Sequence, residues 1–308
     1  MVEATETERA QHGFRSGTVA LVGRPNAGKS TLLNRLIGTK VSIVSDKPQT
    51  TRHRIRGILT EDRGQVVFVD TPGVHRPHYR MNRRMMNVTR QALEDVDLVA
   101  AMIDASEPLG RGTEFLLQML QRVSAPVILL LNKVDRIAKP KLLPLIDRLR
   151  KVDEFAAIIP ISALKGANSD AFLKVVFEYL PPGPPLFPED DLTDRSVRFM
   201  AAELVREQLL HRTREELPYT TAVTVDYWKE PQDPKRQIEI AATIYVERDS
   251  QKPIVIGKGG KLLKQVGTAA RGEIERLLGQ RVHLQLWVKV RPDWRQKARI
   301  LDELEITL

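Results

Sequence analysis

The chain has 308 residues, no cysteine and a formal net charge of +9. This length accommodates two domains of ordinary size, and the absence of cysteine excludes disulfides and thiolate metal sites. No apolar run approaches the roughly 18–20 residues that span a bilayer. The first residues are polar and lack the apolar core of a secretory signal. We therefore expect a cytoplasmic protein in which residues 1–16 form a flexible tail.

Short apolar runs alternate with amphipathic segments over residues 17–181. The runs predict strands at residues 19–22, 65–69, 98–103, 127–131 and 157–161. The amphipathic segments predict helices at residues 29–37, 83–93, 113–122, 141–149 and 169–179. Continuous apolar strands are typical of a sheet that is covered on both faces. The alternation therefore predicts an α/β domain with a mostly parallel sheet and helices on both faces.

A Gly-x-x-x-x-Gly-Lys-Ser motif follows the first predicted strand and opens the first predicted helix. Its residues are Gly23, Arg24, Pro25, Asn26, Ala27, Gly28, Lys29 and Ser30. In this context the motif is typical of a phosphate-binding loop, whose backbone N–H groups converge on phosphate oxygens. We expect Lys29 to reach the β- and γ-phosphates and Ser30 to bind Mg²⁺.

Three more polar segments follow the carboxyl ends of later strands. They comprise Asp70, Thr71, Pro72 and Gly73; Asn132, Lys133, Val134 and Asp135; and Ser162, Ala163 and Leu164. We expect the Asp70 carboxylate in the Mg²⁺ shell and the Gly73 amide on a γ-phosphate. The Asp135 carboxylate can accept both N–H groups that guanine presents together and adenine does not. These segments therefore predict GTP rather than ATP as the ligand.

Residues 45–54 form a polar segment with paired threonines and no core pattern. Such a loop is typical of a switch that folds over Mg²⁺ only when a γ-phosphate is present. We choose Thr51 as the metal-sensing hydroxyl, with Thr50 as the alternative. A surface loop with incidental threonines is the other interpretation.

The composition changes at residues 182–194, which are rich in proline and acidic side chains and predict a semi-rigid linker. Residues 195–308 then predict a separate α+β domain. Its helices are expected at residues 195–214 and 261–278, and its strands at residues 220–227, 238–246 and 282–289.

Most of the excess positive charge lies in this second domain. Between Lys252 and Arg299 there are twelve Lys or Arg residues and three acids, which favours an anionic partner. A Gly-x-x-Gly loop lies in the same stretch, where small residues allow a nucleic-acid backbone to approach. The expected RNA-binding residues are Ile256, Gly257, Lys258, Gly259, Gly260, Lys261, Lys264 and Arg271. We expect Trp287 in the core, and leave Trp294 open between core packing and base stacking.

Together these motifs resemble the bacterial translation-factor-related GTPases, and with a C-terminal type II KH domain they resemble the Era family. The resemblance implies GTP hydrolysis with Lys29, Thr51, Gly73 and Asn26 as catalytic residues, and binding to the 3′ end of small-subunit ribosomal RNA during subunit maturation. It also implies a K⁺ ion bound by Asn26; the alternative is that Asn26 only shapes the loop. Val74 stands where Ras-like proteins have a water-orienting glutamine, so we expect slow hydrolysis.

The leading hypothesis is a monomer in which the nucleotide state switches RNA or ribosome binding. A second hypothesis is a constitutive RNA-binding scaffold with a structural nucleotide. A third is a GTPase that uses its basic face at the inner surface of the membrane. No basic amphipathic helix or lipidation motif supports the third as the main role, so membrane contact is expected to be peripheral at most.

Overall fold

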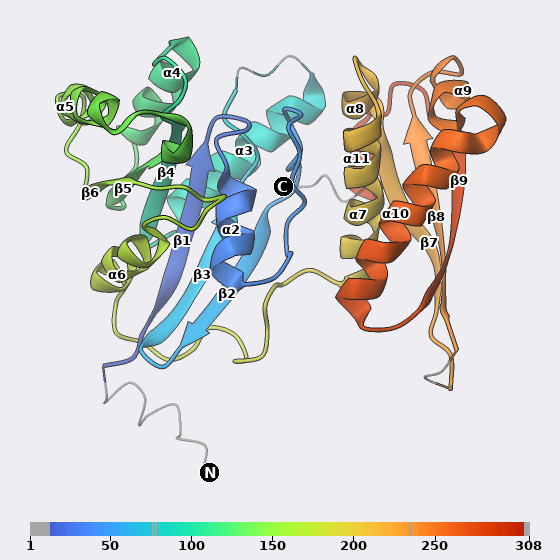
Figure 1. Cartoon of the computed structure of the whole chain (residues 1–308), viewed down its shortest axis with the longest axis horizontal. Helices are drawn as coiled ribbons and strands as arrows, with labels where there is room; N and C mark the ends of the chain where they lie inside the picture. The colour runs from blue at the N-terminus through green and yellow to red at the C-terminus, as the bar shows by residue number, and fades with distance from the viewer. Residues whose placement is uncertain (1–12, 76, 78, 234–235, 305–308) are drawn as a thin grey trace. The chain divides into compact units, whose positions relative to one another are not determined.

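The computed structural model describes residues 13–75, 77, 79–233 and 236–304, which form two compact units (Figure 1). Unit 1 comprises Met1–Ser42, Thr51–Arg76 and Met85–Asp194, and unit 2 comprises Ile43–Thr50, Pro77–Arg84 and Arg195–Leu308. The chain therefore passes from one unit to the other five times, after residues 42, 50, 76, 84 and 194. Residues 1–12, most of the expected tail, lie outside the described residues.

Unit 1 contains a six-stranded sheet. Its strands are β1 (Arg15–Gly23), β2 (Ile55–Glu61), β3 (Gly64–Asp70), β4 (Leu98–Asp104), β5 (Val127–Asn132) and β6 (Ala157–Pro160). Their order is β2-β3-β1-β4-β5-β6, and every pairing is parallel except β2 with β3. The expected α/β architecture is confirmed. Because β1, β3, β4 and β5 run the same way, their carboxyl ends meet at one edge, where ligands of such sheets bind.

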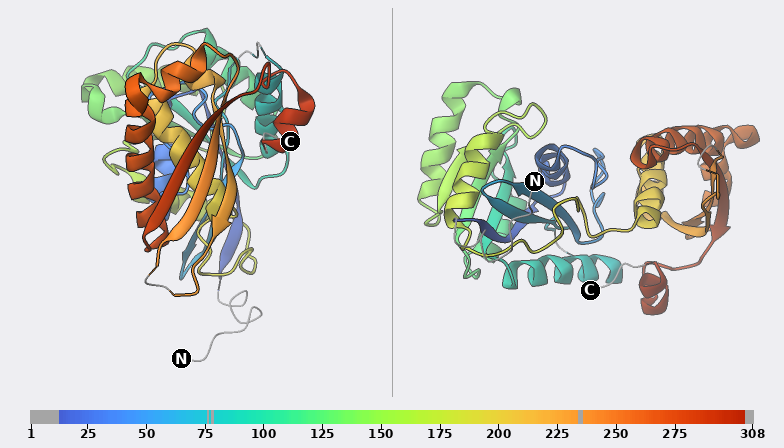
Figure 2. Two further views of the ribbon diagram at one scale, coloured as in Figure 1. Left: turned by 90° about the vertical axis from the view of Figure 1, so that its right-hand side faces the viewer. Right: turned by 90° about the horizontal axis from the view of Figure 1, so that it is seen from below.

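Helices cover both faces of this sheet. They are α2 (Lys29–Ile37), α3 (Arg80–Glu94), α4 (Arg111–Leu120), α5 (Leu142–Arg150) and α6 (Ser169–Tyr179), with short 3₁₀ turns η1 (Val134–Arg136) and η2 (Lys139–Lys141). Met86 of α3, Leu116 of α4 and Leu149 of α5 share one buried apolar cluster with strand residues. Figure 2 shows α2 and α3 on opposite sides of the sheet.

Strand β2 was not predicted from the sequence. It lies at the edge of the sheet, where only its antiparallel neighbour β3 covers its backbone. Its sequence mixes Ile55 and Ile58 with polar residues, so it lacks the continuous apolar run of the central strands. A strand at the edge of a sheet, with part of its surface exposed to solvent, does not need a continuous run of apolar residues.

The proline-rich linker segment is hydrogen-bonded along unit 1. The side-chain oxygen Oε1 of Gln65 accepts from the backbone N–H groups of Leu186 and Phe187, at 2.7 and 2.9 Å. Further along, the N–H of Ile58 donates to the carbonyl of Leu192 at 3.0 Å. The segment is therefore ordered up to Asp194, the last residue of unit 1.

Unit 2 has the element order helix, strand, strand, helix, helix, strand, as expected of a type II KH fold. The main elements are α7 (Val197–Arg212), β7 (Ala222–Lys229), β8 (Ile238–Val246), α9 (Gln251–Ile256), α10 (Lys261–Leu278) and β9 (Val282–Val290), with short turns α8 (Leu217–Thr220), η3 (Lys258–Gly260) and α11 (Ala298–Glu303). Strand β8 is central, antiparallel to β7 and parallel to β9. Buried residues of α7, α10 and all three strands form one apolar core.

The expectation for Trp287 is wrong. Helices α7 and α10 cover one face of the three-stranded sheet, and no described helix covers the other (Figures 1 and 2). Strand side chains alternate between faces, so while Val288 is buried, Trp287 lies on the open face and is 58% exposed. Apolar character alone does not reveal which face a tryptophan occupies.

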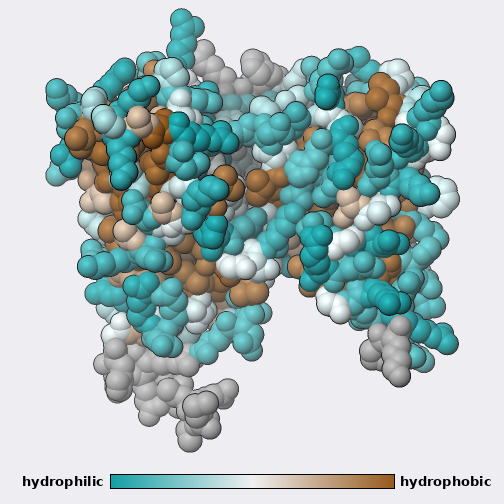
Figure 3. Space-filling view, in the orientation of Figure 1, coloured by the Kyte–Doolittle hydropathy of each residue, from teal (hydrophilic) through white to brown (hydrophobic). Residues whose placement is uncertain are grey.

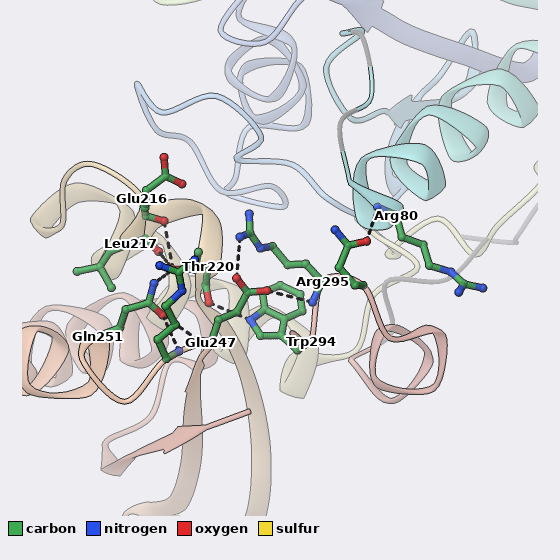
Figure 4. Close-up of polar contacts among 10 residues, drawn as sticks. Arg80, Glu216, Leu217, Thr220, Glu247, Gln251, Trp294 and Arg295 are labelled. Atoms are coloured by element: carbon green, nitrogen blue, oxygen red, sulfur yellow. Dashed lines mark hydrogen bonds and ion pairs between the residues drawn. The ribbon is translucent and has the colours of Figure 1, made fainter. Parts of the chain in front are cut away.

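Trp294, left open by the sequence, is a core residue with no exposed surface. Its indole N–H donates to the carbonyl of Thr220 at 2.9 Å. The neighbouring Arg295 forms an ion pair with Glu247 at 2.6 Å, and the N–H of Arg80 donates to Oε1 of Gln296 at 3.3 Å (Figure 4). The segment after β9 therefore holds residues 79–84 in unit 2.

No helix among the described residues is long and apolar enough to cross a membrane. On the face drawn in Figure 3, hydrophilic side chains cover most of the surface and hydrophobic ones occur in scattered patches.

Candidate functional site

The phosphate-binding loop links the end of β1 to the start of α2. Gly28 caps α2 with φ 105°, and Asn26 also has a positive φ of 62°. A Cβ atom on Gly28 would lie 2.1 Å from Nδ2 of Asn132, and one on Gly23 would lie 2.5 Å from the carbonyl oxygen of Met102. Both glycines are therefore required by close packing of the loop against β4 and β5.

Lys29 points into the loop rather than into solvent. Its ammonium group donates to the carbonyl oxygens of Gly23 and Arg24, each at 3.3 Å. Burial lowers the pKa of Lys29 from its ordinary value, and the nearby Asp70 carboxylate opposes that shift. The loop thus holds the buried Lys29 side chain where a phosphate of the expected ligand would bind.

Asp70 ends β3 and is buried among hydroxyl groups. Its Oδ2 accepts from Ser30 Oγ at 2.6 Å and from Ser42 Oγ at 3.0 Å, while Ser30 Oγ lies 3.0 Å from Thr51 Oγ1. Its Oδ1 has no hydrogen-bond partner among the described residues. Burial raises the pKa of Asp70, although Lys29 and the hydroxyl groups oppose the shift. An unpaired buried carboxylate oxygen is costly unless a cation completes its coordination.

The described residues contain no cluster of three or more His, Cys, Asp or Glu side chains that could hold a metal. One carboxylate with two hydroxyl groups instead fits Mg²⁺, which is usually bound by one or two carboxylates together with substrate phosphates. Of the two candidate threonines, Thr51 contacts Ser30, whereas Thr50 Oγ1 donates to the carbonyl of Lys47 at 2.7 Å. The geometry favours Thr51.

The segment after β3 folds back on the phosphate-binding loop. A Cβ atom on Gly73 would lie 2.7 Å from the backbone N of Pro25, and the N–H of Val74 donates to the carbonyl of Gly23 at 2.9 Å. The Val74 side chain is buried in the apolar cluster of unit 1. His75 Nδ1 lies 2.7 Å from the Gly73 carbonyl. Thr71 and Pro72 support this turn through bonds to Leu21 and Thr89.

The residues predicted to recognise the base meet at the ends of β5 and β6. Asn132 Nδ2 donates to the carbonyl of Ala27 at 2.7 Å, and its Oδ1 accepts from the N–H of Ala163 at 2.9 Å. Asp135 Oδ1 accepts from Ser162 Oγ at 2.5 Å. Asn132 therefore ties the phosphate-binding loop to the Ser162–Leu164 segment, and the predicted pieces form one site.

Lys133 has a partner that the sequence did not reveal. Its ammonium group forms an ion pair with Asp104, at the end of β4, at 2.5 Å. Burial alone would raise the pKa of Asp104, but hydrogen bonds from Lys133 and Ser106 outweigh burial and lower it. Val134 opens the 3₁₀ turn η1, and the Leu164 carbonyl accepts from Arg35 at 2.6 Å.

Unit 2 carries a groove of about 370 Å³ beside the Gly-x-x-Gly loop. Gly257, Gly259 and Gly260 all have positive φ, which allows the tight turn into α10. The groove is lined by one face of α10 and by β9; its lining residues are Gly260, Leu263, Lys264, Gly267, Thr268, Arg271, Leu284 and Leu286. An apolar floor with exposed Lys264 and Arg271 at its rim suits bases and phosphates.

Comparisons with known proteins agree with both halves of this description. Residues 18–133 match the family model of 50S ribosome-binding GTPases, and residues 216–295 match that of KH domains. The structure is similar to that of Era in complex with MgGDPNP and nucleotides 1506–1542 of 16S ribosomal RNA, with 44% identity and a TM-score of 0.93. That match covers 96% of this chain and 100% of the Era chain. The chain belongs to the Era family.

A second Era structure, a variant from Aquifex aeolicus bound to GDP·AlF4⁻, is also 44% identical, with a TM-score of 0.92. It covers 96% of this chain and is itself covered completely. The Era-family assignment confirms the expected fold and a GTPase with a C-terminal KH domain.

Several residues of both sites were missed by sequence reasoning. Ser42 and Asp104 had no motif to mark them, because each contributes one side chain from outside the recognised segments. The groove residues did carry a signal. From Gly260, the lining residues of α10 recur at helical spacing through Leu263, Gly267 and Arg271, which places them on one face.

Proposed function

We propose that this chain binds and hydrolyses GTP with Mg²⁺ at the carboxyl edge of the unit 1 sheet, and binds the 3′ region of small-subunit ribosomal RNA in the unit 2 groove to assist subunit maturation. We assign residues 17–181 to the GTPase domain, 182–194 to the linker and 195–308 to the KH domain. The Era chain at 44% identity carries both ligands, MgGDPNP and 16S ribosomal RNA, which supports the same pairing here.

The observation that carries the nucleotide proposal is the buried Oδ1 of Asp70, which has no hydrogen-bond partner in the part of the chain that the structure describes and lies beside the hydroxyl groups of Ser30 and Thr51. In the proposed site these three side chains hold Mg²⁺, which neutralises charge on the β- and γ-phosphates. Lys29 adds a positive charge to the same oxygens. The Gly73 amide donates to the γ-phosphate, so that catalysis rests on positioning and electrostatics.

Guanine selection is assigned to Asp135, supported by Asn132 and the Ala163 amide. Asp135→Asn exchanges one acceptor oxygen for a donor and should lower GTP affinity about a hundredfold, because one of the two hydrogen bonds is lost and the other no longer reaches a charged acceptor. It should raise affinity for xanthosine triphosphate, which presents the complementary acceptor. Competition binding with both nucleotides measures this, and unchanged GTP preference would contradict the assignment.

RNA binding is assigned to the groove and its glycine turn. Gly257 has φ 76° and ψ 168°, and a Cβ there would lie 2.8 Å from Leu262, so substitution at Gly257 would also distort the turn. Lys264→Glu is cleaner, because this exposed groove residue packs into no core. It should weaken binding of the 3′-end RNA at least tenfold and reduce its salt dependence. Lys252→Glu, an exposed charge change outside the groove, is the matched control.

The switching hypothesis predicts that RNA affinity differs between GDP and a non-hydrolysable GTP analogue. Equal affinities would instead support the constitutive scaffold. Three further expectations stay predictions. K⁺ binding by Asn26 is tested by whether K⁺ stimulates hydrolysis more than Na⁺ does. Light scattering tests the monomeric state, and liposome co-sedimentation tests peripheral membrane contact.

A further inference from the structure

The loop with the paired threonines is divided between the two units. Ile43–Thr50 belong to unit 2, and unit 1 resumes at Thr51. Ile43 is 1% exposed and lies in the apolar core of unit 2 together with Leu204 and Leu210 of α7. The first half of the proposed switch is therefore packed as part of the KH unit, although it precedes that unit in the chain by some 150 residues.

Helix α7 holds this segment with a buried polar stripe. Glu203, Arg206 and Glu207 are each at most 5% exposed and recur at i, i+3 and i+4, so they share one face of the helix. Glu207 Oε1 accepts from the N–H of Val44 at 2.9 Å. At the other end of the segment, Arg206 Nη2 donates to the carbonyl of Thr50 at 2.5 Å. Both ends of the segment are thus hydrogen-bonded to α7.

The Arg206 side chain is also held by Glu203. Its Nε and Nη2 donate to the two carboxylate oxygens of Glu203 at 2.7 and 2.6 Å. The planar guanidinium is therefore locked in orientation, which suits precise placement of one further partner. A buried ion pair of this kind contributes little net stability compared with apolar residues. Its main effect here is therefore to orient the Arg206 guanidinium toward the Thr50 carbonyl.

One peptide bond separates this contact from the proposed Mg²⁺ site. The Thr50 carbonyl is bound by Arg206, and the next residue, Thr51, places its hydroxyl 3.0 Å from Ser30 Oγ. The Thr50–Thr51 peptide is planar, so the held carbonyl restricts where the Thr51 backbone begins. We infer that Arg206 is a positioning residue for Thr51, and that this link couples the nucleotide state to the KH unit.

The inference rests on the proposed Mg²⁺ role of Thr51. Coupling between two ligands is reciprocal: if the triphosphate changes RNA affinity by some factor, RNA changes triphosphate affinity by the same factor. Removing the Arg206 contact should therefore reduce the effect of the triphosphate on RNA affinity and the effect of RNA on triphosphate affinity by the same factor. GDP affinity should stay unchanged, because the proposed Thr51 contact is made only with a γ-phosphate present.

The principal test is the double variant Glu203→Leu/Arg206→Met, which replaces both members of the pair with apolar residues instead of leaving one of them without the other. We expect affinity for Mg²⁺ and a non-hydrolysable GTP analogue to fall about fivefold or more, with GDP affinity unchanged. The ratio of RNA affinities in the two nucleotide states should approach one. Arg198→Met, on the exposed start of the same helix, is the matched control. Wild-type nucleotide discrimination in the double variant would overturn the inference.

Two additions keep the result interpretable. If the double variant unfolds, Arg206→Lys keeps the charge beside Glu203 but loses the fork that binds Thr50, and the same direction of change is expected; full wild-type coupling in it would overturn the inference. Thr51→Val separates the two proposals. If it leaves triphosphate affinity unchanged, the proposed Mg²⁺ role of Thr51 is wrong; if it lowers affinity while the Arg206 variants do not, only the positioning role of Arg206 fails.

Discussion

Single glycines determine how closely the phosphate-binding loop approaches its neighbours. Gly28 and Gly38 cap the two ends of α2, and both have positive φ, 105° and 79°. They differ in their surroundings: a Cβ on Gly28 would lie 2.1 Å from Asn132, whereas one on Gly38 meets nothing within 4 Å. A side chain at Gly38 would introduce backbone strain alone, whereas one at Gly28 would introduce both strain and a steric clash. Comparing the two positions therefore separates these effects.

Gly28→Ala should displace Asn132, break its bond to Ala27 and lower the free energy of unfolding by roughly 3 kcal/mol, with a marked loss of GDP affinity. Gly38→Ala should cost only the backbone strain, about 1 kcal/mol, and leave GDP binding intact. Chemical unfolding and nucleotide titration measure both. Similar losses of GDP affinity in the two variants would show that crowding is not the cause.

The Asp104 carboxylate provides a pH-dependent contribution. Its pKa is lower in the folded protein than its ordinary value, so its ion pair with Lys133 stabilises the fold above the ordinary carboxyl pKa of about 4. That stability is lost as the pH falls through the lowered folded pKa. Asp104→Asn should therefore be less stable than wild type at pH 7 and converge with it in acid. The measurement is the free energy of unfolding of both proteins from pH 7 down into acid. A difference between them that stays constant with pH would refute the prediction.

Among the elements, those with complete local signals were the most predictable. Helices α2, α6 and α10 and strand β8 have the expected bounds, because each combines regular apolar periodicity with a recognisable boundary residue. The nucleotide motifs likewise followed the predicted strands. Edge strand β2 and exposed Trp287 were missed because their environment is set by which neighbours pair with them, not by their own sequence. The partnership of Ile43–Thr50 with α7 had no local signal either.

The segment after β9 contains a buried ion pair in addition to the buried Trp294. Arg295 and Glu247 are each 10% exposed, and the Arg295 carbonyl accepts from the N–H of Met81 at 3.1 Å. Arg295→Met leaves the Glu247 charge uncompensated and should destabilise unit 2 by about 3 kcal/mol. Glu247→Gln/Arg295→Met should recover much of that loss in denaturant unfolding. A double variant as unstable as the single one would argue against this explanation.

At the scale of the whole molecule, two segments belong to a unit other than that of their flanking residues. In a fragment ending at Asp194, Val44 would lose its Glu207 acceptor, whereas Ser42 would keep its bond to Asn34 Oδ1 at 2.9 Å. We expect the Val44 amide to exchange hydrogen at least tenfold faster in that fragment than in the full chain, and the Ser42 amide to be unchanged. Equal protection of Val44 in both would show that α7 does not order the segment.

The five crossings of the chain also limit how this architecture can be recombined. Cutting after Asp194 separates the sequence at one point but leaves Ile43–Thr50 and Pro77–Arg84 behind with the GTPase unit. A chimaera with a foreign KH domain would retain two segments that pack in the native protein against the original KH unit, which is no longer present. Functional chimaeras should therefore require those two segments to be exchanged together with the KH domain. The exchangeable unit is defined by which residues pack together, not by a single boundary in the sequence.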